Sequence, residues 1–364
     1  MSVDADERFL REALAVAARA RLRTAPNPTV GALVVRKGRV VARAATHGLV
    51  AHAEAIALER AGAAARGATL YVTLEPCAHW GRTPPCVDAV IAARPKRVVI
   101  GMIDPDPRTR GASIRKLRRA GIEVRAGVLL DACARHHEGF VSRVLRGRPF
   151  TTLKLAASLD GRIATATGES RWISSPPARA FVQRLRARTD AVAVGSNTVL
   201  ADDPELRARG ENRIVHSPLR VVVDARLRTP ASARIFDSTQ PGSAIVLCGR
   251  DASQRLRARL ERAGARVLPV RKRGAHLDIE AAWQALGALG VNECLVEGGG
   301  GLAAALLRAR LVDRMHFFLA PLFIGSDGRA VLAGLGVTRL GEALRPQSFS
   351  VRRLGPDVHC TAEW

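Results

Sequence analysis

The chain has 364 residues, enough for two domains that each bury a core of their own. Its apolar content of 47% excludes a disordered protein, and no apolar run approaches the roughly 20 residues that a membrane-spanning helix needs. The formal net charge of +24 directs attention to anionic ligands, either nucleic acids or small phosphorylated molecules.

The first part of the chain alternates between helical and strand patterns. Residues 5–22 carry apolar side chains at helical spacing, and a turn at Lys37-Gly38 separates two short strands. The predicted elements after the first helix are strands over 30–35 and 40–45, a helix carrying His52 and ending near Arg60, a strand over 69–73, a helix over 86–92, a strand over 97–101, a helix over 114–120 and a strand over 122–125. This alternation predicts an α/β domain with helices on both faces of one sheet.

A domain boundary follows this first set of elements. A helix predicted over 129–145 leads into Arg146-Gly147-Arg148-Pro149, so the sequence predicts one domain over residues 1–146 and a second over 150–364. His136 and His137 lie on that helix, but adjacent residues do not share a helix face. We therefore interpret them as surface or interdomain residues and not as metal ligands.

The second part of the chain again shows buried strands separated by helices. Strands are predicted over 150–157, 190–195, 220–224, 244–248 and 293–297. The last of these runs into four glycines, Gly298 to Gly301, followed by a helix over 302–308. A glycine loop that enters a helix N-terminus is a ready anion site, because its free N–H groups point outward and its glycines allow close approach or a positive φ. The run lacks the full dinucleotide-binding glycine pattern, so by itself a tight strand-to-helix turn is the simpler interpretation.

The stretch from His52 to Cys86 carries the clearest chemistry. His52, Cys77 and Cys86 offer one imidazole and two thiolates, which suit a zinc ion that keeps one position open for water. Zinc in such a site lowers the pKa of water from roughly 16 to roughly 7. Glu54 lies two residues after the histidine, where it can carry a proton without occupying the metal. His-x-Glu followed by Pro-Cys and a second cysteine is typical of zinc deaminases that act on amino-substituted bases.

Two features of this stretch leave an alternative open. A closed structural zinc site needs four protein ligands, and His79 lies between the two cysteines as a candidate fourth. The second cysteine also follows the first by nine positions, whereas zinc deaminases commonly use Cys-x-x-Cys.

The short motifs around Cys77 and Cys86 resemble those of a known family. The segment Thr73-Leu-Glu-Pro-Cys77, then His79, then Gly81-Arg-Thr-Pro-Pro-Cys86, closely resembles the bifunctional riboflavin-biosynthesis deaminase/reductases. Further matches are Pro26-Asn-Pro28 with Val30-Gly31, Lys154-Leu-Ala156, and Ser158-Leu-Asp-Gly161. The resemblance covers nearly the whole chain. It implies an N-terminal cytidine-deaminase-like α/β/α domain and a C-terminal α/β domain similar to dihydrofolate reductase.

The resemblance also implies cofactors and site residues. The first domain should hold zinc on His52, Cys77 and Cys86 with Glu54 as the proton carrier, and the second should bind NADPH. Residues expected at the cofactor are Ala156, Trp172, Thr198, Asp202, Gly299, Gly300, Gly301, Leu302, Ala303, Ala304 and Ala305. Residues expected at the substrate are Ser170, Arg186, Leu206, Arg209 and Glu297. Arg186 and Arg209 can in principle clamp a sugar phosphate with paired hydrogen bonds, although a solvated surface arginine is the simpler interpretation of each.

The reaction implied is hydrolytic deamination of a phosphoribosylated diaminopyrimidinone, followed by NADPH-dependent reduction of its ribose to a ribityl chain. Some positions depart from the family. Ala78 and Trp80 replace the usual neighbours of His79, Asp106 stands in place of Asn, Ser113 stands in place of Gly, and the segment from His47 to His52 is about two residues short. These departures concern pocket contacts and not the zinc chemistry.

The basic charge is compatible with a second interpretation, a nucleoside or transfer-RNA deaminase with an accessory domain. A third is a binding protein that keeps zinc without turnover. Of the 57 basic residues only five are lysines, and the 52 arginines are spread along the whole chain. Aromatic residues make up only 4%, too few to favour a base-stacking platform. We therefore expect a small phosphorylated pyrimidine as substrate, with no nucleic acid or membrane partner; a homo-oligomer is compatible with the sequence. The acidic N-terminus without an apolar signal core and the scattered cysteines predict a cytoplasmic protein without disulfides.

Overall fold

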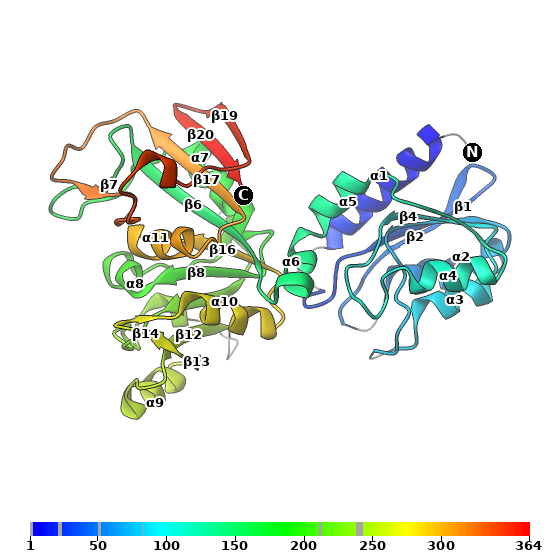
Figure 1. Cartoon of the computed structure of the whole chain (residues 1–364), viewed down its shortest axis with the longest axis horizontal. Coiled ribbons are helices and arrows are strands. Elements are labelled where there is room, and N and C mark those ends of the chain that lie inside the picture. The colour runs from blue at the N-terminus through cyan, green and yellow to red at the C-terminus, as the bar shows by residue number, and fades with distance from the viewer. Residues whose placement is uncertain (1–2, 21–23, 50–51, 82, 211–212, 238–242) are drawn as a thin grey trace. The chain divides into compact units, whose positions relative to one another are not determined.

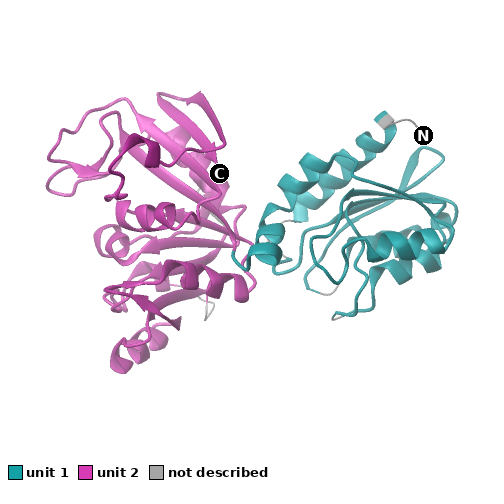
Figure 2. Cartoon of the chain, viewed as in Figure 1, with its two compact units in different colours: residues 1–148 teal, residues 149–364 magenta. Residues whose placement is uncertain are grey.

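The structure is a computed structural model that describes residues 3–20, 24–49, 52–81, 83–210, 213–237 and 243–364. The chain forms two compact units, Met1–Arg148 and Pro149–Trp364, which Figure 2 colours separately. Each unit has its own sheet and its own apolar core. Among the described residues, no helix combines the length and apolar character needed to cross a lipid bilayer.

Unit 1 is built on a five-stranded mixed sheet in the order β2-β1-β3-β4-β5. Its strands are β1 (Gly31–Arg36), β2 (Arg39–Ala45), β3 (Thr69–Leu74), β4 (Arg97–Met102) and β5 (Glu123–Ala126). β1 pairs antiparallel with β2 and β3, whereas β3–β4 and β4–β5 are parallel. The carboxyl ends of the parallel strands therefore share one edge of the sheet, and functional groups that follow these strands lie at that edge.

Helices cover both faces of this sheet because its strands carry apolar side chains on both sides (Figure 1). The helices of the unit are α1 (Val3–Ala20), α2 (Ala53–Ala61), α3 (Cys86–Ala93), α4 (Ala112–Arg119), α5 (Leu130–His136) and α6 (Glu138–Arg146). Leu33 and Val35 pack with Phe9 and Leu10 of α1. The alternate side chains of β1 face the opposite core, which is covered by α2, α3 and α4. Residues 21–22 of the predicted first helix lie outside the described residues.

The single helix predicted over 129–145 is wrong: the chain turns at His137, between α5 and α6. His137 adopts φ −100° and ψ 9°, and its side chain is 2% exposed. Its Nε2 lies 3.2 Å from Thr73 Oγ1 at the end of β3. The surface position predicted for His137 is therefore also wrong, because the turn directs the ring inward against the sheet.

Unit 2 contains a nine-stranded sheet in the order β13-β12-β11-β8-β16-β6-β17-β20-β19. Its strands are β6 (Phe150–Ser158), β8 (Ala191–Gly195), β11 (Leu219–Val223), β12 (Ala244–Gly249), β13 (Ala265–Val270), β16 (Glu293–Glu297), β17 (Arg314–Ala320), β19 (Ser348–Leu354) and β20 (Asp357–Glu363). Seven neighbouring strands of this sheet run parallel, namely β13, β12, β11, β8, β16, β6 and β17. The strands β20 and β19 add an antiparallel hairpin next to β17. Short pairs are β7 (Arg162–Ala164) with β18 (Arg329–Ala330), β9 (Ala208–Gly210) with β10 (Arg213–His216), and β14 (Lys272–Arg273) with β15 (His276–Leu277).

The parallel strands of unit 2 are buried on both faces, as near-continuous apolar runs such as Ala191–Gly195 predict. Its helices are α7 (Pro176–Arg186), α8 (Ser196–Asp202), α9 (Gln254–Arg262), α10 (Ile279–Ala288) and α11 (Gly300–Arg308). Short 3-10 turns are η1 (Gly62–Ala65) in unit 1 and η2 (Arg234–Phe236) and η3 (Leu340–Glu342) in unit 2. α11 begins at Gly300, two residues before the predicted start, so the glycine run is half turn and half helix.

Candidate active sites

Three metal-ligating side chains meet in unit 1 from three separate elements. His52 directly precedes α2 in an extended conformation, with φ −83° and ψ 147°. Cys77 follows β3, and Cys86 is the first residue of α3. Val87 N donates a 3.2 Å hydrogen bond to the Cys77 carbonyl, which ties the loop after β3 to the start of α3. The sequence predicted that His52 lies on this helix. In the structure it is the N-cap residue, directly before the first helical residue.

The donor atoms of these residues are close enough to hold one ion. His52 Nδ1 lies 2.9 Å from Cys86 Sγ and 3.6 Å from Cys77 Sγ, and the ligand atoms all lie within 4.8 Å of one another. Zinc bonds of about 2.0–2.3 Å in a tetrahedron place neighbouring ligand atoms roughly 3–4 Å apart. One imidazole and two thiols in this arrangement fit a zinc ion that keeps its fourth position for water.

Hydrogen bonds within the cluster favour the thiolate form of Cys77 in the absence of a metal ion. The hydrogen bond from Cys86 and the contact with His52 lower the pKa of the Cys77 thiol to about 4, whereas the same hydrogen bond raises the pKa of Cys86. The Cys86 backbone N–H also donates to Cys77 Sγ at 3.2 Å. The pKa of His52 is raised, chiefly by its hydrogen bond with Cys77. Metal binding competes with the proton on Cys86, because only the thiolate is a strong ligand.

Glu54 lies in the first turn of α2 with its side chain enclosed. It is 3% exposed, and its Oε2 has no hydrogen-bond partner among the described residues. Burial raises the pKa of this carboxyl. A buried carboxyl oxygen without a partner is costly unless a ligand or water satisfies it. This environment suits a group that takes up and releases a proton during a reaction.

A second buried carboxylate holds the loop next to the cluster. Glu75, two residues before Cys77, accepts hydrogen bonds from Ser113 Oγ at 2.7 Å and from the backbone N–H of Gly111 at 2.9 Å. The N–H of Asp104 adds a third at 3.3 Å. The segment from Asp104 to Ser113 is thereby fixed to the strand end that carries Cys77. Ser113, one of the departures from the family, supplies the shortest of these contacts.

His79 does not join the metal cluster. Its Nδ1 lies 3.0 Å from Thr109 Oγ1, which also accepts a 3.3 Å hydrogen bond from Ala78 N. The cluster of candidate ligands among the described residues consists of His52, Cys77 and Cys86. The closed four-ligand alternative is therefore not the arrangement that the structure shows. Arg82 of the same motif lies outside the described residues.

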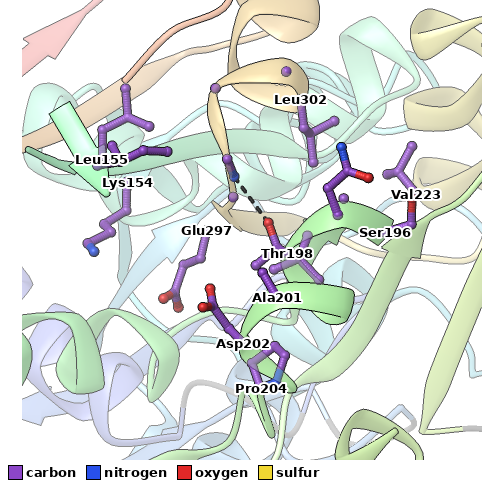
Figure 3. A pocket seen from close by; sticks show the side chains of 18 of the residues that line it. Lys154, Leu155, Ser196, Thr198, Ala201, Asp202, Pro204, Val223, Glu297 and Leu302 are labelled. Atoms are coloured by element: carbon purple, nitrogen blue, oxygen red, sulfur yellow. Dashed lines mark hydrogen bonds between the residues drawn. The ribbon is translucent and has the colours of Figure 1, made fainter. Parts of the chain in front are cut away.

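Unit 2 contains a cavity of about 1800 Å³ along the carboxyl ends of β6, β16, β8 and β11. In Figure 3, Lys154 and Glu297 lie at one side of the view, and Leu302, Ser196 and Val223 lie at the other. The volume exceeds the few hundred to about 1,000 Å³ of a typical ligand pocket, so the cavity has room for more than one small molecule. The carboxyl edge of parallel strands is where open α/β sheets bind ligands.

The lining of the cavity contains most residues that the family resemblance placed there. These are Ala156, Ser170, Trp172, Arg186, Thr198, Asp202, Leu206, Arg209, Glu297, Gly299, Gly300, Gly301, Leu302 and Ala305. Ala303 and Ala304 are absent from it, and each is 0% exposed. Successive residues turn by about 100° along a helix, so these two alanines face the core while Gly301 and Ala305 face the cavity. Their predicted cofactor contact is not supported.

The glycine run has a different structural basis from the one expected. Gly298 and Gly299 form the turn, none of the four glycines has a positive φ, and Gly299 N donates to Thr198 Oγ1 at 3.2 Å. A Cβ on Gly300 would lie 2.9 Å from Val331 O, a contact within the protein itself. A Cβ on Gly301 would meet no atom within 4 Å. The open space along the glycine run therefore lies at Gly301.

The two arginines expected to clamp a phosphate are already paired with carboxylates. Arg186 donates to both oxygens of Glu297, at 2.6 and 2.8 Å, and its Nη1 donates to Arg207 O at 3.2 Å. Arg209 forms an ion pair with Glu205. Arg186 and Arg209 therefore do not form the expected phosphate clamp in this structure, because their N–H groups donate to acceptors of the protein itself.

Sequence reasoning missed the part of the cavity at the end of β11. Asp224, Arg226 and Arg228 line it, next to Ser196 and Asn197 at the start of α8. The available signal was the apolar strand over 220–224, since polar residues that follow a parallel strand lie at the ligand-binding edge.

Comparisons with known proteins match a family model to each unit. The model of the cytidine and deoxycytidylate deaminase zinc-binding region matches residues 3–102, and that of the RibD C-terminal domain matches residues 149–360. The riboflavin biosynthesis protein RibD of Escherichia coli (strain K12) is 40% identical, over 97% of this chain and 98% of that protein. The Aquifex aeolicus RibD is 38% identical, over 97% of each chain.

Solved structures give the same result along the whole chain. Acinetobacter baumannii RibD, form 1, is 34% identical with a TM-score of 0.89, covering 100% of this chain and 99% of that one. A deaminase/reductase from Thermotoga maritima is 32% identical with a TM-score of 0.83, covering 99% of each chain. The resemblance seen in the motifs around Cys77 and Cys86 is thus confirmed. With its zinc-binding deaminase unit followed by a reductase unit, the chain belongs to the RibD family of bifunctional riboflavin-biosynthesis enzymes.

Proposed function

We propose that this chain catalyses two consecutive steps of riboflavin biosynthesis. Unit 1 deaminates 2,5-diamino-6-(5-phosphoribosylamino)pyrimidin-4-one, with water as co-substrate and ammonia as product. Unit 2 then reduces the ribosyl group of the product to a ribityl chain with NADPH. The observation that carries the first step is the set of His52, Cys77 and Cys86 beside the enclosed carboxyl of Glu54.

In unit 1, His52, Cys77 and Cys86 would hold the zinc ion. When bound, zinc supplies Lewis-acid activation of water at neutral pH. Glu54 would accept the proton of that water at its unpartnered Oε2 and deliver it to the departing amine nitrogen. Glu75 supports this arrangement, because it fixes the loop from Asp104 to Ser113 against the strand end that carries Cys77.

In unit 2, the cavity would bind NADPH and the deaminated substrate side by side. NADPH supplies the hydride, so the protein's task is to bind and orient both molecules. Cofactor contacts are proposed for Ala156, Trp172, Thr198, Asp202 and the cavity-facing residues Gly299 to Leu302 and Ala305. Substrate contacts are proposed for Ser170, Arg186, Leu206, Arg209 and Glu297, with Arg186 and Glu297 acting as one hydrogen-bonded unit.

The partners proposed are small molecules, in the cytoplasm, without nucleic acid. The arginines are distributed along the whole chain. Because the cavity of unit 2 suits a dinucleotide, the positive charge can be explained by the binding of small molecules. All six cysteines are free, as a reducing compartment requires. A transfer-RNA deaminase would instead bind RNA with strong salt dependence and would not need NADPH.

The test is incubation of the purified chain with the diaminopyrimidinone, with and without NADPH, while ammonia and NADPH are followed separately. Ammonia release should not require NADPH, and NADPH consumption should follow ammonia release. Ammonia release without any later NADPH oxidation would contradict the reductase step, and oxidation of NADPH without ammonia release would contradict the order of steps.

A further inference from the structure

Two segments of unit 2 that are far apart in the sequence both contribute to the wall of its cavity. The first strap, residues 159–173, connects β6 to α7 and supplies Ser170 and Trp172 to the lining. The second strap, residues 321–335, follows β17 and supplies Leu332. The two straps lie side by side near the β7 label of Figure 1, where β7 and β18 form an antiparallel pair. They therefore form one continuous part of the cavity wall.

The two straps are joined mainly by hydrogen bonds between their backbones. Leu159 N donates to Leu322 O at 2.9 Å, and Val331 N donates to Gly161 O at 2.9 Å. Apolar burial contributes less, because side chains of the straps face outward, with Leu159 48% and Phe323 77% exposed. A segment that is held by exposed backbone hydrogen bonds and few buried apolar contacts opens locally more readily than the core of the sheet. The separation of the straps is therefore sensitive to any side chain that joins them.

Asp160 is the one side chain in the described part of the chain that makes a hydrogen bond from one strap to the other. Its Oδ2 accepts from Gly325 N at 2.7 Å and from Ile324 N at 3.2 Å, and its Oδ1 lies 3.2 Å from the same Ile324 N. Asp160 follows β6 directly, in a turn that Gly161 N closes by donating to Ser158 O at 3.0 Å. Because β6 pairs with β17 up to Ser158, the carboxylate joins the second strap to a fixed point of the sheet.

Asp160 acts on the cavity through the residues that it holds. It is outside the set of residues that line the cavity, whereas Ser170 and Trp172 of the first strap are within it. The second strap also reaches the glycine run, because Ala333 N donates to Gly300 O at 3.1 Å. Separation of the straps would therefore displace wall residues on two sides of the same cavity.

We propose that Asp160 is a positioning residue of the reductase, which holds the two straps together so that their cavity-lining residues meet the bound ligands in one arrangement. The inference rests on the proposed reductase function and adds a residue that acts through others. Two adjacent backbone N–H groups donate to one carboxylate, and hydrogen bonds to a charged acceptor are stronger than those to a neutral one. Asp160 does not touch the reacting atoms, so its loss should weaken binding more than turnover.

The first measurement is limited trypsin digestion of the full-length chain without ligands, with fragments identified by mass spectrometry. Arg171 and Arg329 are exposed cleavage sites, one in each strap. Asp160→Ala should be cut at these sites about tenfold faster than the unmodified chain, because loss of the charge-assisted hydrogen bonds raises the population of the open straps. Asp160→Asn keeps an acceptor oxygen of the same reach and should recover most of the protection.

The second measurement is the steady-state reduction of the deaminated substrate by NADPH. Asp160→Ala should raise the KM of the substrate about tenfold and change kcat less than about threefold, with Asp160→Asn again close to the unmodified chain. Asp327→Ala is the matched control, since Asp327 is an exposed carboxylate of the second strap that accepts no hydrogen bond from the described residues. It should match the unmodified chain in both measurements. Thermal unfolding should be the same for all four proteins.

An unchanged KM in Asp160→Ala would overturn the positioning role, whether or not the straps are cut faster. A loss of kcat as large as the rise in KM, together with a lower unfolding temperature, would also overturn it, because Asp160 would then support the fold of unit 2 in general. Absence of reduction by the unmodified chain would overturn the reductase function and this role with it. The three results differ, so failure of the inference is distinguishable from failure of the proposed function.

Discussion

Arg186 and Glu297 are joined by two hydrogen bonds, Nε to Oε1 at 2.6 Å and Nη2 to Oε2 at 2.8 Å. Their side chains are only 17% and 12% exposed. Burial alone raises the pKa of Glu297, but the charge and hydrogen bonds of Arg186, with a contribution from Lys154, lower it overall. The pair therefore remains charged inside the cavity wall, and each member depends on the other.

Arg186→Met should destabilise unit 2 because it leaves the Glu297 carboxylate buried without its main partner. Breaking a buried pair from one side costs about 3–5 kcal/mol. Arg209→Met is the control, since that arginine is 47% exposed beside Glu205, and exposed pairs contribute about 1 kcal/mol or less. Urea denaturation gives both free energies of unfolding. Equal losses in the two variants would contradict the structural importance of the Arg186–Glu297 pair.

Glu54→Gln should retain zinc but lose deamination. The amide keeps the shape of the side chain but cannot take up the proton that Glu54 would move, a change that typically costs about 10²–10⁴-fold in rate. Ammonia release measures the rate, and elemental analysis measures zinc. Glu59→Gln, at an exposed position of the same helix, is the matched control and should keep the unmodified rate. Near-normal ammonia release by Glu54→Gln with full zinc would remove Glu54 from the reaction.

Loss of a metal ligand should abolish deamination and leave reduction intact. Cys77→Ser and Cys86→Ser should each lose zinc and deamination, because serine is a poor zinc ligand beside imidazole and thiolate. Reduction of substrate that has already been deaminated should continue, since the proposed reductase residues all lie in unit 2. Cys133→Ala alters a buried cysteine of unit 1 outside the cluster and should keep zinc. Full zinc occupancy in both serine variants would exclude these cysteines as ligands.

The sequence was most informative where function depends on short segments. His52, Cys77 and Cys86 were predicted to lie together, and they do, because a few adjacent residues encode each part of that cluster. Five of the seven parallel strands of unit 2 were also predicted, because strands buried on both faces give continuous apolar runs, as in Ala191–Gly195. β13 and β17 were not predicted.

Elements held by distant contacts were not predicted. β19 is almost entirely exposed, and its apolar run is short, with Phe349 and Val351 followed by two arginines, yet it pairs with β20 along its whole length. α9 buries little beyond Leu260 and gives an equally weak signal. The pairing of Arg186 with Glu297 joins residues 111 positions apart, which no local pattern encodes. The inward orientation of Ala303 was missed because alanine is compatible with either face of a helix.

The glycine run allows structure and cofactor binding to be separated. Gly301→Val should weaken NADPH binding without loss of stability, because the added side chain enters the open space proposed for the phosphates. Gly300→Ala should lower stability, because its Cβ would lie 2.9 Å from the Val331 carbonyl oxygen and must displace backbone. Fluorescence titration with NADPH and thermal unfolding separate the two effects. Unchanged NADPH affinity in a well-folded Gly301→Val would identify this run as a structural turn.

Two buried histidines in the β17–β20 pair are arranged as neutral rings. Arg352 Nε donates to His359 Nδ1 at 3.0 Å, so the proton of His359 lies on Nε2. That nitrogen lies 3.0 Å from His316 Nδ1, which must therefore accept. A second proton on either ring would face a donor already in place. Burial is the main cause that lowers the pKa of His316 to about 3 and that of His359 to about 4.

Unit 2 should therefore lose stability in mild acid. In the unfolded chain both histidines take up protons below their ordinary pKa of about 6.5, whereas in the folded unit they stay neutral to much lower pH. The stabilisation is thus complete above about pH 6.5 and declines as the pH falls toward 4, by about 2 kcal/mol for each histidine at pH 5. Urea unfolding at pH 7.5 and pH 5.0 measures the decline. His359→Gln should reduce it by about half, because one of the two proton-binding groups is gone, and His276→Gln, at an exposed position, should not. An equal pH dependence in all three proteins would show that other groups control the acid stability of unit 2.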